Sequence, residues 1–235
     1  MTTTDLPVTT PRRTDRGAIG VAALAGLGWF VAGFGATTPD APEPGTASVT
    51  EIRAYVADST GTLSVNTISA VVGVIALIVI ASALGRIIEH HRTGSVLPAV
   101  VLAGAVLASL QGIFLVAVDG VWLLLDEDVS KLGDDSVRTL FDLAAVSHGI
   151  TSVVLPVGCV LVVGVTSWAA LRDRFLARPV AVLGLLIGLA GAVAALEIVV
   201  DSSVMAVPFF FALFGWFLWP AVVAVNLGVR WVRTR

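Results

Sequence analysis

Charged residues are scarce in this sequence: they make up 13% of its 235 residues, whereas hydrophobic residues make up 57%. In soluble domains about a quarter of the residues are charged. The mean hydropathy of +0.95 points the same way. The composition therefore excludes an ordinary soluble globule and predicts a protein whose solvent is lipid.

Cysteine and lysine are almost missing, with one residue of each. Because Cys159 is alone, an intrachain disulfide is excluded, and its apolar neighbours in the sequence favour a small buried hydrophobe over a reactive thiol. The sequence has thirteen arginines and one lysine, Lys131, and this preference for arginine is expected of a GC-rich bacterial genome.

Six apolar runs are long enough to cross a membrane. A bilayer core needs about 20 apolar residues in a helix, and none of the runs alternates like a barrel strand. The sequence therefore predicts an all-α membrane bundle of six transmembrane helices over residues 17–230, with a disordered tail, 1–16, and a short tail, 231–235. The predicted spans are 17–36, 64–85, 96–125, 140–171, 180–200 and 204–229.

The arginines predict the orientation of these spans. Three basic residues, Arg53, Lys131 and Arg138, fall on one side, and the other eleven fall on the opposite side. Such an excess in short segments near span ends marks the cytoplasmic face. Both termini are therefore predicted to be cytoplasmic, in a bacterial plasma membrane. The eleven are Arg12, Arg13, Arg16, Arg86, Arg92, Arg172, Arg174, Arg178, Arg230, Arg233 and Arg235.

The loop between the first two spans carries a helix signal. Ser48 followed by Glu51 is the pattern of a capping box, and Ile52, Tyr55 and Val56 share one helical face. The pattern predicts a short external amphipathic helix. It either lies on the outer membrane surface or packs on the bundle as a lid.

Polar residues inside spans are the default functional candidates, because a charged group costs roughly 2.5–3.5 kcal/mol at the bilayer centre. The ionisable ones sit in the outer halves of their helices, and Glu197 shares a helical face with Asp201. Together they predict an outward-facing polar pocket. Its candidate members are Gln111, Asp119, Asp142, His148, Glu197 and Asp201.

Helix length offers another interpretation of two of these residues. The third and fourth spans exceed the bilayer by about ten residues each, so Asp119 and Asp142 would be ordinary charges at the water boundary.

Small and aromatic residues predict packing. Gly184, Gly188 and Ala192 recur every four residues and predict close approach of another helix. The last span is rich in Phe and Trp before Pro220, which predicts a kink. This aromatic cluster either faces lipid or walls a site for an acyl chain.

Short elements along the chain resemble a known group. Residues 48–58 read SVTEIRAYVAD and lead into a span ending in Leu84-Gly85-Arg86; Phe141-Asp142-Leu143 opens the fourth span, and Arg178-Pro179 enters the fifth. In these elements the chain resembles a domain-of-unknown-function family of small polytopic membrane proteins from GC-rich Gram-positive bacteria. The resemblance implies this architecture and no established activity, cofactor or site.

Three functional hypotheses stay open. The first is a non-enzymatic accessory or lipid- or solute-binding component, whose partners are the bilayer and another membrane protein or a second copy. The second is a proton- or cation-coupled carrier using Glu197, Asp119 and His148. The third is an intramembrane hydrolase with a metal held by His148, Asp119 and Asp142, although the spacing lacks a metal-site pattern and no cofactor is predicted. The basic residues are too dispersed to predict nucleic-acid binding.

Overall fold

The computed structural model describes the backbone of residues 13–35, 41–198 and 206–233, and all regular structure within these ranges is helical. The predicted all-α class is therefore confirmed. Two short segments, η1 and η3, are 3-10 helices, and η2 is a π-helix. The elements are α1 (Arg13–Gly35), α2 (Val49–His91), α3 (Leu97–Leu125), η1 (Asp126–Lys131), α4 (Asp134–Gly158), η2 (Cys159–Gly164), α5 (Val165–Asp173), α6 (Arg178–Ala194), η3 (Ala195–Ile198) and α7 (Ala206–Arg233).

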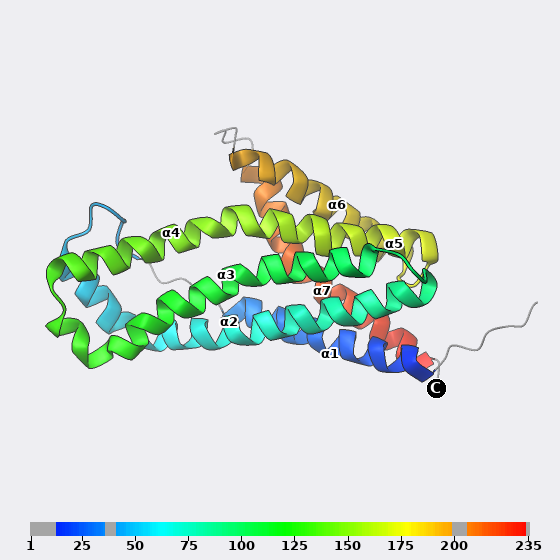
Figure 1. Cartoon of the computed structure of the whole chain (residues 1–235), viewed down its shortest axis with the longest axis horizontal. Coiled ribbons are helices and arrows are strands. Elements are labelled where there is room, and N and C mark those ends of the chain that lie inside the picture. Colours follow the sequence, from blue (N-terminus) through cyan, green and yellow to red (C-terminus); the bar gives the residue numbers. More distant parts are fainter. Residues whose placement is uncertain (1–12, 36–40, 199–205, 234–235) are drawn as a thin grey trace, which may run out of the picture.

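These elements form six rods, because α4, η2 and α5 follow one another without a break and η3 extends α6. The rods pack into a bundle (Figure 1). Within the described ranges, five helices are long and apolar enough to cross a membrane, and α6 is a shorter apolar helix of 17 residues. The molecule is thus an all-α membrane bundle. The end of the predicted fifth span, 199–200, lies outside the described residues.

Helix α2 corrects the prediction of a separate external helix. The capping box is present: Ser48 Oγ accepts from the Glu51 backbone N–H, and the Glu51 carboxylate accepts from the Ser48 backbone N–H at 2.8 Å. The helix that starts there does not stop before the second span but runs 43 residues to His91. The sequence between holds no proline, and Gly61 alone costs only about 1 kcal/mol.

The first turns of α2 pack against protein. Ile52 and Val56 are buried with Trp122 of α3 and with Val137 and Phe141 of α4. The interpretation of this segment as a lid is therefore confirmed. We call the first turns of α2, the end of α3, η1 and the start of α4 the cap; in Figure 1 it extends beyond α1, α6 and α7 at one end of the molecule.

Arg53 ties the cap together. Its guanidinium donates to the backbone carbonyls of Val129 and Leu132, the second at 2.7 Å, and pairs with the Asp134 carboxylate at 3.0 Å. The planar fork of arginine suits several acceptors held at fixed angles. One side chain from α2 thus fixes the turn that joins α3 to α4.

The glycines of α6 face the π-helical segment η2 and the start of α5. Cβ atoms added at Gly184 and Gly188 would lie 1.9 Å from Ser167 Oγ and 2.8 Å from Gly164 Cα. The stripe continues at Gly191, which faces Cys159, whereas Ala192 is exposed. The predicted close approach is correct for the two glycines and wrong for Ala192. After Gly188, an advance of three residues to Gly191 stays on the contact face better than a second advance of four to Ala192, because a helix turn has about 3.6 residues.

Candidate functional site

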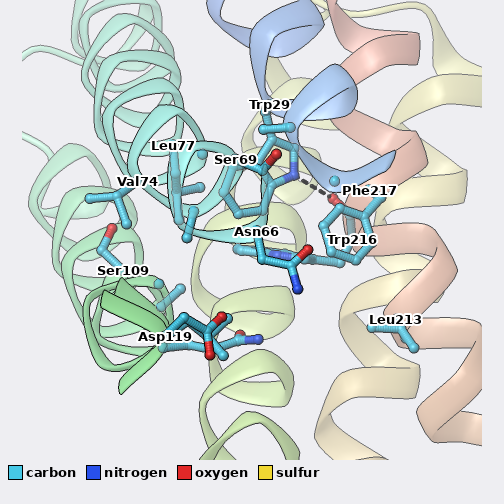
Figure 2. A pocket seen from close by; sticks show the side chains of 18 of the residues that line it. Trp29, Asn66, Ser69, Val74, Leu77, Ser109, Asp119, Leu213, Trp216 and Phe217 are labelled. Atoms are coloured by element: carbon cyan, nitrogen blue, oxygen red, sulfur yellow. Dashed lines mark hydrogen bonds between the residues drawn. The ribbon is translucent and has the colours of Figure 1, made fainter. Parts of the chain in front are cut away.

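A cavity of about 490 Å³ lies among helices α1, α2, α3 and α7, and we call it the chamber. Figure 2 shows it from close by, with side chains of these helices pointing into it. Its wall is mostly apolar, with a few amide and hydroxyl groups and one carboxylate. Its lining includes Trp29, Asn66, Ser69, Asp119, Trp216 and Phe217.

Three aromatic rings form one wall of the chamber. The indole of Trp29 stacks on Phe217 with ring centroids 5.8 Å apart and meets Trp216 edge-on at 5.4 Å. Its Nε1–H donates to the Trp216 carbonyl at 3.2 Å. Pro220, four residues after Trp216, has no N–H to donate to that carbonyl within the helix. The proline therefore frees an acceptor that holds Trp29 in place.

The predicted aromatic cluster of α7 divides between two environments. Phe210, Phe211 and Phe214 lie on the outside of the bundle with exposed rings, whereas Trp216 and Trp219 are buried. The interpretation as a lipid-facing cluster holds for the first group only. Helix α7 runs continuously through Pro220, and its kink stays a prediction.

Asp119 supplies the carboxylate of the chamber. It is only 5% exposed although it lies near the end of α3. Gly112 of α3 packs against Ala70 and Val74 of α2. The two helices are antiparallel, and Asp119 lies about two turns after Gly112 on α3. It is therefore level with a residue about two turns before this contact on α2, which is Asn66. Both side chains reach the chamber (Figure 2).

A second cavity of about 470 Å³ lies under the cap, and we call it the vestibule. It is lined by the loop before α2, including Pro42 and Glu43, and by Tyr55 and Phe141. Asp119 lines this cavity as well as the chamber. The buried carboxylate therefore stands at the boundary between the two spaces.

The structure brings two of the predicted pocket residues together. Gln111 and Asp119 both line the chamber. The interpretation of Asp119 as an ordinary charge at the water boundary is wrong, because the side chain is buried. Asp142 instead accepts a hydrogen bond from the Gly45 backbone N–H at 3.3 Å and holds the loop before α2. The side chains of His148 and Glu197, and all of Asp201, lie outside the described residues.

Sequence reasoning missed the part of the chamber that α2 contributes. Asn66, Ser69 and Gly73 recur at intervals of three and four, so they share one helical face. That small and polar face in an otherwise apolar span is the signal that identifies it. Asn226 of α7, a polar residue in the last span, has a structural role instead: it accepts from the Ala177 backbone N–H at 3.2 Å and fixes the loop before α6.

The described side chains hold no group of three or more His, Cys, Asp or Glu residues that could bind a metal. Of the ligands suggested for a hydrolase, Asp119 lines the chamber and Asp142 binds the loop. His148 lies outside the described side chains, so the hydrolase hypothesis stays untested.

Comparison with known proteins gives no relative. No protein-family model, curated protein or solved structure matches the chain. The resemblance to a domain-of-unknown-function family stays a prediction, and function has to be argued from the chamber itself.

Proposed function

We propose that this protein is a non-enzymatic membrane component that binds a small apolar or amphiphilic molecule in the chamber. The observation that carries the proposal is the cavity itself. Its volume of about 490 Å³ falls within the roughly 300–1,000 Å³ of ligand pockets. Apolar and aromatic walls with a few convergent polar groups are the usual makeup of such pockets.

Filling the chamber tests this proposal. Ser69 lines the chamber, and the adjacent Ile68 points away from the core with 64% of its surface exposed. Ser69→Phe is expected to remove bound molecules that native mass spectrometry detects on the wild-type protein extracted from its membrane. Ile68→Phe, the matched control, should retain them. Equal retention by both variants would place the bound molecules elsewhere and contradict the proposal.

A second candidate function, a cation- or proton-coupled carrier, is favoured by the position of Asp119. A carboxylate shared by two cavities can be reached from both. Ionisable groups buried in membrane helices commonly mark ion or proton routes. If the protein is a carrier, reconstituted vesicles should show proton or cation flux, and Asp119→Asn should abolish that flux. A protein that only binds its ligand should show no flux.

We also propose that both termini are cytoplasmic and that the cap faces outward. The end of the bundle opposite the cap is rich in arginine. Arg92 pairs with Asp173 at 2.6 Å, and the Trp168 ring lies 5.1 Å from the Arg92 guanidinium carbon and 5.2 Å from that of Arg172. Arginine marks cytoplasmic ends of spans, and tryptophan favours the membrane interface.

Cysteine labelling tests this orientation. Thr93 and Asp135 are exposed at opposite ends of the bundle, and the native Cys159 is buried. In intact cells, a membrane-impermeant maleimide is expected to label Asp135→Cys. Thr93→Cys should react only after the membrane is permeabilised. The reverse pattern would invert the proposed topology.

A further inference from the structure

We infer that the ligand of the chamber is a monovalent organic cation, an ammonium group carrying an apolar body, with the Asp119 carboxylate as its counter-ion. This inference rests on the proposed binding function and names the class of molecule bound. Three observations carry it: the sign of charge in the cavities, the aromatic wall, and the small number of oxygen ligands.

The charge lining both cavities is acidic. Among the described lining residues, the acidic side chains are Asp119, shared by the two, and Glu43 of the vestibule, and no Lys, Arg or His lines either cavity. Electrostatic interactions are stronger inside a low-dielectric bundle than in water. A cation entering from the vestibule meets Glu43 at the loop and Asp119 at the boundary of the chamber. An anion of the same shape meets repulsion from both.

The aromatic wall suits a diffuse positive charge. Trp29, Trp216 and Phe217 line the chamber and pack against one another. The π-faces of aromatic rings attract cations, with tryptophan the strongest, and groups of such rings bind quaternary ammonium ions. The same rings accept an apolar body through ordinary burial.

The ligand set argues against calcium and magnesium. Calcium takes six to eight oxygen ligands and magnesium requires nearly octahedral geometry. The described lining of the chamber offers one carboxylate, the amides of Asn66 and Gln111, and the hydroxyls of Ser69 and Ser109. A cavity of about 490 Å³ with mostly apolar walls fits an organic cation better than a bare ion.

A pair of probes that differ only in charge tests the inference. The cation is trimethyl(3-phenylpropyl)ammonium, and its neutral isostere has carbon in place of the nitrogen. Binding to the purified full-length protein is followed by quenching of tryptophan fluorescence, because Trp29 and Trp216 line the chamber. The wild-type protein is expected to bind the cation at least about tenfold more tightly than the isostere.

Variants of Asp119 separate charge from shape. Asp119→Asn is expected to lower cation affinity by about tenfold or more and to leave affinity for the isostere unchanged. Asp119→Glu keeps the charge and should keep the preference for the cation. Asp58→Asn is the matched control, since Asp58 is an exposed carboxylate of α2 that lines neither cavity, and its replacement should not affect either affinity.

The outcomes distinguish this inference from the proposed function. Equal affinity of the wild-type protein for both probes overturns the cation inference and leaves a neutral-ligand chamber standing, provided that Ser69→Phe abolishes binding. Binding that survives Ser69→Phe, or no binding of either probe together with no molecule retained on the purified protein, overturns both. The wild-type comparison needs no variant to fold.

Discussion

Replacing Gly188 by alanine is expected to lower the free energy of unfolding by about 2 kcal/mol, the usual size of an overpacking effect. The added Cβ atom would lie 2.8 Å from the Cα atom and 3.2 Å from the backbone nitrogen of Gly164. Both are backbone atoms, so no side-chain rotation can relieve the contact. The two rods would have to move apart, which also loosens the contact of Gly191 with Cys159.

The same chemical change at Gly120 is the matched control. Gly120 also lies within a helix, but an added Cβ there meets no atom within 4 Å. Alanine favours the helix over glycine by up to about 1 kcal/mol, so Gly120→Ala should leave stability unchanged or raise it. Reversible unfolding in mixed micelles measures both variants. Equal losses at the two positions would show that close contact is not the cause.

Replacing Arg53 by lysine is expected to destabilise the cap by about 2 kcal/mol. The lysine ammonium cannot reach the carbonyls of Val129 and Leu132 together in the geometry of the arginine fork. The ion pair with Asp134 contributes little, because that carboxylate is 76% exposed. The loss therefore comes mainly from carbonyls left without a donor. Hydrogen exchange of the backbone amides of residues 129–137 should become faster, while exchange in α6 stays unchanged.

Arg138→Lys controls for loss of the guanidinium alone. Arg138 also lies in the cap and donates one long hydrogen bond, 3.5 Å, to the Ala47 carbonyl. Its replacement should change exchange in the cap very little. Faster exchange of similar size in both variants would contradict the special role given to Arg53.

Much of the fold can be predicted from the sequence because the bilayer requires long apolar helices. The prediction of a separate external helix was wrong because no residue after Val56 ends that helix. The cap segment and the second span therefore form one continuous helix. The π-helical segment η2 follows Pro156, and no pattern in that apolar run distinguishes it from an α-helix.

The candidate site was less predictable, since exposure depends on tertiary packing. Asp119 and Asp142 look alike in sequence, each near the cap end of its helix. One is buried between two cavities, and the other binds a loop N–H. Which role each carboxylate has depends on which helix lies opposite, and a single sequence does not contain that information.

The unbroken helix α2 has a mechanical consequence. At about 1.5 Å per residue it is a stiff strut of roughly 65 Å, more than twice the thickness of a bilayer core. Near its middle, α2 packs against two helices: Gly73 contacts Trp29 of α1, and Val74 contacts Gly112 of α3. Its first turns are packed in the cap and its last turns, which end beside Arg92, in the main core, so this one helix couples the cap rigidly to the opposite end of the bundle.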